Sequence, residues 1–396
     1  MNNVYQDTTN KKQVYLIDAF NSINKNLYIT ILNKYNSEKL LRILWLNWRD
    51  ITHPEAGGAE VLTHEVMKRL VNYGHEATLF CPIVEGRPSE EVIDGVKIIR
   101  KGGKYTTYNQ GRKFFKTNKK KYDVVIDEVN PRPFLNPKIL DGTPSVLLFH
   151  QFIREEWFYE MPFPLSYFCY YYENRWLLPY RNSVTVTVSN SSKNDLEAIG
   201  FNNVKVIPMG INVKPLEEVS TKNELPTVVF IGRLKRHKLP DHAVKAFSLI
   251  RKQIPSAQMW VIGDGYMLKD LKKIHSQNIN FSGHVNDKIK YELLSKAHLV
   301  LVPSMREGWG LVVTESNAMG TPVVAYDVNG LRDSVVEGTN GIFTKRNDPD
   351  SLAESALKIL NDKQTMNSLS NSALEYSRKF SWDKTADYFQ HLIESL

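Results

Sequence analysis

The sequence is poor in the features that mark secreted and membrane-spanning proteins. It holds only two cysteines, Cys81 and Cys169, among 396 residues. Two cysteines are too few for a disulfide framework and favour a reducing cytoplasm. No run of 18 apolar residues occurs, and the N-terminus lacks the charged start and continuous apolar stretch of a signal peptide. We therefore expect a cytoplasmic protein that folds without disulfide bonds and has no membrane-spanning helix.

The fingerprint of dinucleotide-dependent oxidoreductases is also missing. That fingerprint is G-x-G-x-x-G directly after a strand, with an acidic residue about 20 residues further on. Gly263-Asp264-Gly265 comes closest, but the third glycine is absent and the segment lies in the middle of the second half of the chain. The sequence therefore argues against an oxidoreductase of this class.

Positive charge, by contrast, is abundant. The chain has 51 lysines and arginines against 43 aspartates and glutamates, a net charge of +8. Such an excess suits an anionic ligand, an anionic membrane surface or nucleic acid. No nucleic-acid-binding motif accompanies it, so we expect no nucleic-acid partner. The charge concentrates in one stretch without acids, which contains Arg100, Lys101, Lys104, Arg112, Lys113, Lys116, Lys119, Lys120 and Lys121.

From Arg42 onward, short apolar runs alternate with helical patterns, and a polar stretch interrupts this alternation once. Alternating strands and helices predict parallel sheets covered on both faces. We therefore expect an α/β fold with two Rossmann-like doubly wound domains facing a cleft, and ligands at the carboxyl ends of the strands. The expected segments are an extension that could form an amphipathic helix (1–40), a first domain (41–213), a linker (214–226), a second domain (227–380) and a helix packing back on the first domain (381–396).

Two basic residues follow the first strand of the second domain. Arg233 lies at the carboxyl end of the run Val228–Ile231, and Lys238 lies five residues later. An arginine fork and a lysine point charge could hold a diphosphate there and stabilise it as a leaving group. Basic residues after a strand are also common as ordinary surface charges.

The second candidate element runs from Val302 to Glu315. A strand is expected to end near Val302, and a helix to begin near Leu311 after a loop with two glycines. A helix N-terminus favours a phosphate, and Glu307 and Glu315 flank this position. Because a carboxylate repels phosphate, each is expected to bind hydroxyls, such as those of a hexose and a ribose. Both could instead be helix-start acids that complement the helix dipole.

The order of these motifs resembles the retaining glycosyltransferases of family 4, also called group 1. Glu307 and Glu315 are spaced as in the E-x7-E signature of that family, and Gly232-Arg233 to Lys238 is similar to its diphosphate motif. The resemblance covers roughly residues 42–380. Further segments in the family's order are Ala56–Glu60, Val261–Gly265, Phe281–Val285, Ala318–Ala325 and Asn340-Gly341.

The resemblance implies a GT-B fold and assigns roles residue by residue. Arg233 and Lys238 resemble the diphosphate pair. Glu307 resembles the acid that contacts the donor hexose, and Glu315 resembles the acid that binds the ribose. The remaining donor-binding positions are Gly57 and Gly58 facing the phosphates and acceptor, Gly283, His284 and Val285 at the base, and Gly308, Trp309, Gly310 and Leu311 at hexose and phosphate.

His150 follows the strand that ends at Phe149 and matches a histidine that the family often places near the reacting centre. Many members read His-Asp there, whereas this chain reads His150-Gln151. This departure puts the local hydrogen-bond role of His150 in question. A histidine after a strand is also often only structural.

The implied reaction is transfer of a hexosyl group from a nucleoside-diphosphate sugar to a hydroxyl group, with retention of anomeric configuration. Such transfer passes through an oxocarbenium-like state. We expect front-face attack, with the leaving diphosphate stabilised by cations and helix amides, so that no metal or other cofactor is needed. The alternatives are a GT-B protein of other chemistry, such as an epimerase, a sugar-phosphate synthase or a phosphorylase, and a non-catalytic binding subunit.

The acceptor is expected to be a glycan or a lipid-linked sugar, as in assembly of cell-surface polysaccharides, glycolipids or glycoprotein glycans. Residues 157–180 contain eleven aromatic side chains, which could form core, stack on sugars or lie against lipid head groups. The basic stretch, with Phe114 and Phe115 among its lysines, could touch an anionic membrane or form a solvated helix face. A peripheral position on the inner face of the membrane is therefore expected.

Overall fold

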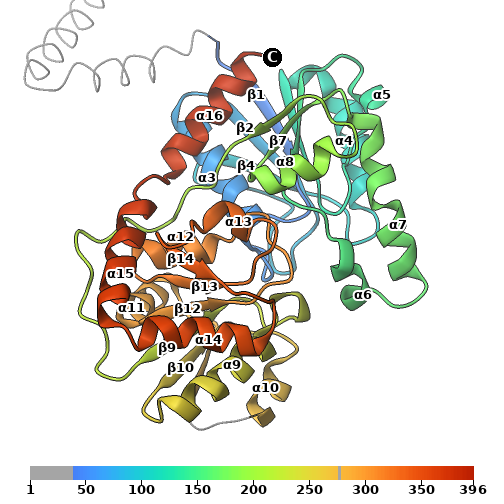
Figure 1. Cartoon of the computed structure of the whole chain (residues 1–396). Coiled ribbons are helices and arrows are strands. Elements are labelled where there is room, and N and C mark those ends of the chain that lie inside the picture. Colours follow the sequence, from blue (N-terminus) through green and yellow to red (C-terminus); the bar gives the residue numbers. More distant parts are fainter. Residues whose placement is uncertain (1–38, 275–277) are drawn as a thin grey trace, which may run out of the picture.

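The computed structural model describes residues 39–274 and 278–396, which form two α/β domains, each built on its own sheet (Figure 1). The predicted fold class is thereby confirmed. The predicted extension, residues 1–40, lies almost entirely outside the described residues. In the part of the chain that the structure describes, no helix is both long and apolar enough to cross a bilayer.

The sheet of the first domain has eight strands in the order β3-β4-β2-β1-β5-β6-β7-β8, and every neighbouring pair except β3 and β4 is parallel. Its central strands are almost fully buried, as apolar runs without alternation predict. The strands are β1 (Arg42–Leu46), β2 (Glu76–Cys81), β3 (Glu90–Ile93), β4 (Val96–Arg100), β5 (Val124–Glu128), β6 (Ser145–Phe149), β7 (Val184–Thr187) and β8 (Val204–Val206).

Helices cover both faces of this sheet (Figure 1). The loops after β1, β5 and β6 open toward the second domain and supply the first-domain residues of the site described below. The helices are α3 (Gly58–Asn72), α4 (Thr107–Asn118), α5 (Pro137–Leu140), α6 (Trp157–Glu160), α7 (Leu165–Leu177) and α8 (Asn190–Glu197).

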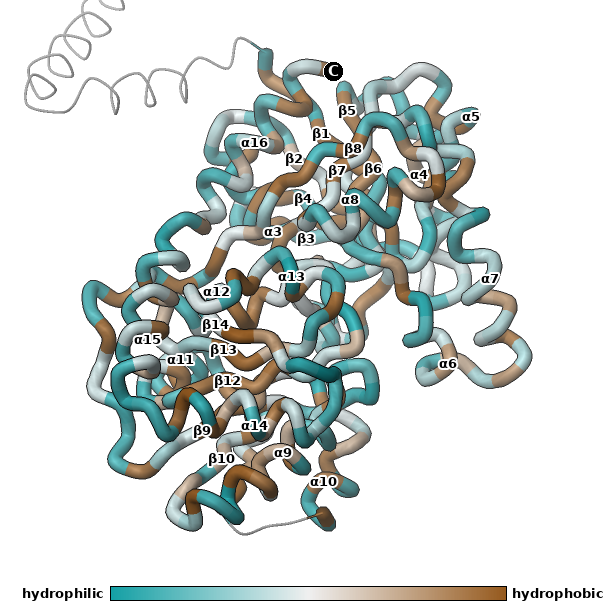
Figure 2. Tube along the Cα trace, viewed as in Figure 1, coloured by the Kyte–Doolittle hydropathy of each residue, from teal (hydrophilic) through white to brown (hydrophobic). Residues whose placement is uncertain are grey.

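The second sheet has six strands, all parallel, in the order β11-β10-β9-β12-β13-β14. Figure 2 shows its apolar strands inside the domain, between more polar helices. The strands are β9 (Thr227–Ile231), β10 (Gln258–Ile262), β11 (Ile279–Gly283), β12 (Leu299–Val302), β13 (Val323–Ala325) and β14 (Gly341–Phe343). The helices are α9 (Pro240–Gln253), α10 (Leu268–Ile274), α11 (Asp287–Lys296), α12 (Leu311–Ala318), α13 (Leu331–Ser334), α14 (Pro349–Leu360) and α15 (Lys363–Ser377).

The last helix, α16 (Trp382–Glu394), leaves the second domain and packs against α3 of the first (Figure 1). The Arg69 guanidinium lies 2.7 Å from the Asp383 carboxylate, and the Tyr73 hydroxyl donates to Asp387 at 2.7 Å. Phe389 is fully buried in the core of the first domain. The chain therefore crosses between the domains twice, once before β9 and once before α16.

The basic stretch at residues 100–121 is only partly a solvated surface. Arg100 is buried, and its Nε lies 2.6 Å from the Asp50 carboxylate. Phe115 is fully buried in a core cluster, and the Phe114 ring lies 5.1 Å from that of Phe80. The prediction that these phenylalanines touch a membrane is therefore wrong, because they form the inner face of α4. The exposed cations are Lys101, Lys104, Lys113, Lys116, Lys120 and Lys121.

The aromatic stretch differs from the basic stretch, because helix α7 has two polar residues on its buried face. Ser166 and Glu173 are buried, and the Glu173 carboxylate accepts the backbone N–H of Arg154 at 3.1 Å. Most aromatic residues of α6, α7 and the turn between them face solvent instead, whereas Trp157 at the start of α6 is buried. The exposed apolar and aromatic side chains are Phe158, Tyr159, Phe163, Leu165, Tyr167, Phe168, Tyr171 and Tyr172, which we call the α6–α7 aromatic surface.

Candidate active site

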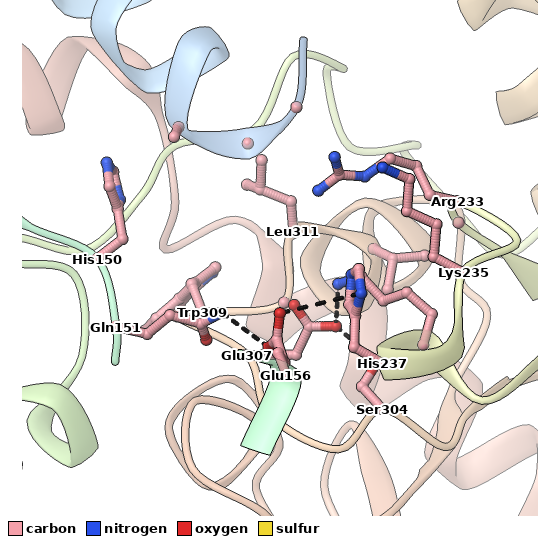
Figure 3. Close-up of a pocket in the computed structure, with 18 of the residues that line it drawn as sticks. His150, Gln151, Glu156, Arg233, Lys235, His237, Ser304, Glu307, Trp309 and Leu311 are labelled. Atoms are coloured by element: carbon pink, nitrogen blue, oxygen red, sulfur yellow. Dashed lines mark hydrogen bonds and ion pairs between the residues drawn. The ribbon is translucent and has the colours of Figure 1, made fainter. Parts of the chain in front are cut away.

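A cavity of about 450 Å³ lies between the two domains, at the carboxyl ends of strands from both sheets. Loops after β1, β5 and β6 line it from one side, and loops after β9 and β12 line it from the other. Figure 3 shows side chains from the two domains converging on this space. Among the predicted site residues, the lining includes Gly57, Gly58, His150, Arg233, Lys238, Glu307, Gly308, Trp309, Gly310 and Leu311.

One end of the cavity is suited to an anion. Gly310 has a φ of +89°, which glycine adopts at little cost, and helix α12 begins directly after it. The free N–H groups at a helix start and the positive end of the helix dipole bind phosphates. A Cβ built on Gly58 would lie 3.2 Å from Leu311 Cδ1, and one on Gly57 would lie 3.9 Å from an Arg233 nitrogen. The glycine loop, the α12 start and one guanidinium therefore meet at the same place.

The other predicted cation, Lys238, is held by a carboxylate. Its Nζ lies 2.5 Å from Glu307 Oε1, and the Ser304 hydroxyl donates to the same oxygen at 2.7 Å. Burial alone raises the pKa of Glu307, but Lys238 and Ser304 outweigh burial and hold this pKa below its ordinary value. Glu307 is therefore an ionised carboxylate inside the cavity, and Lys238 neutralises it in the absence of ligand.

His150 is fixed from behind by a second buried carboxylate. Its Nε2 lies 2.8 Å from Glu128 Oε1, and Glu128 also accepts hydrogen bonds from Trp45 Nε1 and the Thr63 hydroxyl. Because a carboxylate only accepts, this contact assigns the ring proton to Nε2. A Cβ on Gly308 would lie 3.2 Å from the His150 backbone oxygen, so only a very small residue fits where the two domains approach.

Several lining residues were not predicted. They follow His150 in the segment that leads into and includes α6, lie beside Arg233 and Lys238 after β9, or lie beside Glu307 after β12. The short distance in sequence from the predicted residues was the available signal, but their side-chain directions depend on packing between the domains. These residues are Gln151, Glu156, Trp157, Glu160, Lys235, His237 and Ser304.

Five buried polar atoms of this lining have no hydrogen-bond partner within the described residues. They are Arg49 Nε, Gln151 Oε1, Trp157 Nε1, His237 Nδ1 and Trp309 Nε1. Buried polar groups in folded proteins are almost always paired, so unpaired ones in a cavity indicate a ligand that pairs with them. Both donors and acceptors are left over, which matches a ligand rich in hydroxyl groups.

Four predicted donor-binding residues lie outside this lining: Gly283, His284, Val285 and Glu315. Glu315 accepts hydrogen bonds from Lys290 Nζ and the Tyr291 hydroxyl, both at 3.0 Å. Val285 packs against the core cluster that contains Val313 of α12. These residues thus gather around α11 and α12, next to the phosphate end, and their assigned contacts to base and ribose stay predictions.

Trp309 lines the cavity and also packs at the contact between the two domains. It is buried in a core cluster formed mainly by the first domain, where its ring centre lies 5.4 Å from that of Phe380. The loop that starts α12 is therefore anchored to the opposite domain. Its predicted role, in a loop whose backbone amides contact hexose and phosphate, stays a prediction.

No cluster of three or more histidine, cysteine, aspartate or glutamate side chains able to hold a metal ion occurs within residues 39–274 and 278–396. One Asp-x-Asp pair exists in the sequence, Asp348-Pro349-Asp350. Asp348 caps α14 by accepting the Ser351 N–H at 2.8 Å, and neither aspartate lines the cavity. This pair is explained by the helix start.

Two family models match consecutive parts of the chain. Residues 56–214 match the model described as Glycosyltransferase Family 4, and residues 214–376 match the one described as Glycosyl transferases group 1. Together the two matches span residues 56–376 and, with the two-domain fold, support a glycosyltransferase of the GT-B type. Both matched models describe glycosyltransferases, so the predicted alternative of another chemistry is not favoured.

Similar proteins agree with this assignment. An uncharacterized glycosyltransferase of Methanocaldococcus jannaschii is 29% identical over 215 residues, covering 53% of this chain and 59% of that protein. The chain spans less than two thirds of the length of the curated relatives that it matches. Sucrose-phosphate synthase of Thermosynechococcus elongatus has a TM-score of 0.72 at 19% identity, with 89% of this chain and 98% of that chain covered. HepE of Anabaena, in complex with UDP-glucose, has a TM-score of 0.67 at 17% identity, with 90% and 100% covered.

Proposed function

We propose that this protein transfers a hexosyl group from a nucleoside-diphosphate sugar to an acceptor hydroxyl, with retention of anomeric configuration and without a metal ion. The observation that supports the proposal is that different groups line the two ends of the cavity. One end has Arg233 and the start of α12 for a diphosphate, and the rest has Glu307 and several unpaired polar atoms for a sugar. HepE, which shares the fold, was solved with UDP-glucose.

The proposed chemistry follows from this distribution of groups along the cavity. The bond between the anomeric carbon and the diphosphate oxygen breaks, and the acceptor oxygen bonds to the same face of that carbon while its proton passes to the leaving diphosphate. Arg233, Lys238 and the α12 amides stabilise the negative charge that builds up on the diphosphate. Glu307 and His150 hold the hexose, and Glu315 holds the ribose. The cations do the work that a divalent ion does elsewhere.

A thermal-shift panel of UDP, GDP, ADP and dTDP with their common sugars tests the donor. One base should raise the melting temperature selectively, because only the folded state binds it. Product from the matching sugar should keep the donor's anomeric configuration by proton NMR, at the same rate with and without EDTA. An inverted product, or activity lost in EDTA and restored by Mg²⁺, would contradict the mechanism.

Glu315→Gln tests the ribose contact directly. Glu315 is already hydrogen-bonded to Lys290 and Tyr291, so this change keeps the local shape while removing the charge. We expect the Kd for the matching nucleoside diphosphate to rise by about tenfold, the loss of one charge-assisted hydrogen bond. Unchanged affinity by calorimetry would remove Glu315 from the donor site.

We also propose that the acceptor is presented at a membrane, where the α6–α7 aromatic surface lies in the bilayer interface. Phe163 is 79% and Tyr171 68% exposed, although apolar faces of helices normally point into a core. Tyrosines and tryptophans gather at membrane interfaces because one end is apolar and the other wet. Trp157 and Glu160 belong to α6, which contributes to this surface, and both line the cavity. A sugar on a lipid held at this surface can therefore reach the cavity.

The positive charge supplies the second part of this proposal. The net charge is +8, and the six lysines exposed along and around α4 lie on the same domain as the aromatic surface. An anionic bilayer attracts such a surface by about 1 kcal/mol for each basic residue near it. Vesicle sedimentation should show binding to anionic lipid that weakens with salt. Phe168→Ser/Tyr171→Ser should reduce this binding, whereas Tyr388→Ser on the exposed face of α16 should not; absence of binding at low salt would favour an acceptor free in solution.

A further inference from the structure

The wall of the cavity that faces Glu307 is acidic, and the first domain supplies it. Glu156 ends a short 3-10 turn (Arg154–Glu156), and Glu160 ends α6. Both line the cavity and approach one ring: Glu156 Oε2 lies 3.9 Å and Glu160 Oε1 3.6 Å from His237 Nδ1. Figure 3 shows Glu156 beside Glu307 and His237, away from His150 and Arg233. Three carboxylates thus converge on one part of the site.

These carboxylates are unevenly neutralised. Glu307 holds Lys238 at 2.5 Å. Glu156 is only 12% exposed, and Gln151 Nε2 approaches it at 3.5 Å, the limit of a hydrogen bond. Among the described residues, neither Glu156 nor Glu160 has an arginine or lysine within ion-pair distance. Burial lowers the pKa of His237 to about 3, so His237 contributes no positive charge. A buried carboxylate without partners is costly, so a ligand is expected to supply them.

The position of this acidic wall decides which part of a donor it can meet. A diphosphate is attracted to Arg233 and the α12 start and repelled by carboxylates, so the wall faces the sugar. A carboxylate accepts hydrogen bonds from neighbouring hydroxyls and pairs with an ammonium group. A sugar that carries its own carboxylate would add a like charge beside the mostly buried Glu156 and the exposed Glu160, which is unfavourable.

We infer that Glu156 and Glu160 form an acidic subsite that takes a neutral or amino hexose and rejects a hexuronic acid. This inference rests on the proposed function, because it concerns the sugar of the same donor. Glu156 and Glu160 are specificity-determining residues: they act by discriminating between sugars, and the transfer itself does not require their charge. The unpaired Gln151 Oε1 and Trp157 Nε1 lie on the same segment and supply an acceptor and a donor for hydroxyls.

The test compares donors that differ only at carbon 6 of the sugar. UDP-glucose with UDP-glucuronate, and GDP-mannose with GDP-mannuronate, are titrated by calorimetry at pH 8 against the full chain, with UDP and GDP alone as references. The hexuronate of the accepted base should bind at least about tenfold more weakly than its hexose. Glu156→Gln/Glu160→Gln should reduce this ratio to threefold or less by strengthening hexuronate binding. Glu155→Gln changes an exposed neighbouring carboxylate outside the cavity and should leave the ratio unchanged.

The outcomes separate this inference from the function on which it rests. If UDP or GDP binds and its hexose and hexuronate bind equally well, the acidic subsite is overturned while the proposed function stands. A ratio that the double variant leaves unchanged also overturns it, because the discrimination then comes from elsewhere. If none of UDP, GDP, ADP and dTDP binds, and none of the four sugars binds, the proposed donor chemistry and the subsite fail together. A melting curve of each variant shows whether it is folded.

Discussion

The two sides of the cavity are built differently. The second domain presents its residues on short loops at strand ends: Arg233 after β9, Glu307 after β12, and the start of α12. The first domain contributes a longer segment from His150 to α7, in which Glu156 and Glu173 are largely buried and many aromatic residues are exposed. Under the proposed function, the second-domain side binds phosphate through backbone N–H groups and fixed charge. Under the same proposal, the first-domain side discriminates between sugars and meets the acceptor.

Under the proposed function, this difference indicates which residues determine the choice of sugar and acceptor. A helix start and a guanidinium bind any diphosphate, so the second-domain side suits a family with many sugars. The segment Gln151–Leu177 carries the discriminating groups, Glu156 and Glu160, and the exposed aromatic residues. Changes on the two sides should therefore have different consequences: loss of turnover on one, and altered choice of partner on the other.

The largest expected effect is on the phosphate side. Arg233→Ala should lower kcat by about 10²- to 10³-fold, because a group that stabilises the leaving charge is lost. Steady-state rates at saturating donor measure it. Arg236→Ala, an exposed cation outside the cavity, is the matched control and should change kcat less than twofold. Near-normal turnover in Arg233→Ala would remove Arg233 from the reaction.

Substitutions in the Lys238–Glu307 pair should separate its contribution to stability from its contribution to turnover. Lys238→Met leaves Glu307 buried and unpaired, so the free energy of unfolding should fall by about 2–3 kcal/mol in urea titrations. Adding Glu307→Gln should recover most of this loss without restoring turnover. If Lys238→Met alone keeps full stability, the 2.5 Å contact is not a strong pair in solution.

The acidic subsite should depend on pH. Burial, opposed by Lys238, raises the pKa of Glu156 to about 7, so Glu156 is largely protonated at pH 6 and ionised at pH 8. Repulsion of a hexuronate requires the ionised form, so the ratio of hexuronate to hexose Kd should rise severalfold from pH 6 to pH 8. Glu156→Gln should flatten this rise. The charged and titratable groups around Glu156 are Arg233, His237, Lys238, Glu160 and Glu307.

The smallest expected effect is on folding when the exposed aromatic residues are changed. Phe168→Ser/Tyr171→Ser should alter the free energy of unfolding by less than about 1 kcal/mol, as surface substitutions usually do. Phe115→Ala, in the core of the same domain, should cost about 3–5 kcal/mol. Urea unfolding measures both. A large loss from the α7 changes would mean that this surface is covered within the protein.

The phosphate side could be predicted from sequence because its signals are local. Arg233, Glu307 and Leu311 each follow directly on a strand or begin a helix, so the position in sequence gives the position in space. Strands such as β1 and β5 were predictable for the same reason, since their apolar runs are buried on both faces. The edge hairpin was missed because β3 is only partly buried and β4, although mostly buried, is a short run that contains Lys97 and Arg100.

Elsewhere, the composition of a segment did not determine which side chains point into the core and which point toward solvent. Arg100 is one cation of a basic run, but Asp50 on another loop holds it inside the domain. Phe115 turns into the core among exposed lysines, whereas Tyr171 turns outward among residues of similar hydropathy. Glu156 is one of two adjacent glutamates, and only contacts with His237 across the cavity distinguish it from Glu155. Such assignments require tertiary contacts that no local pattern contains.

The two chain crossings lie at the same edge of the molecule. Trp382 Nε1 donates to Asn212 Oδ1 at 2.6 Å, and the Thr385 hydroxyl donates to the Pro208 carbonyl at 2.9 Å, which ties both crossings together. Other interdomain contacts are polar, such as the ion pairs of Lys235 with Glu55 and of Arg306 with Asp195. One contact is apolar, because Trp309 of the second domain is buried in the core cluster of the first. Loss of the two ion pairs alone would therefore leave the domains joined by this tryptophan and by the two chain crossings.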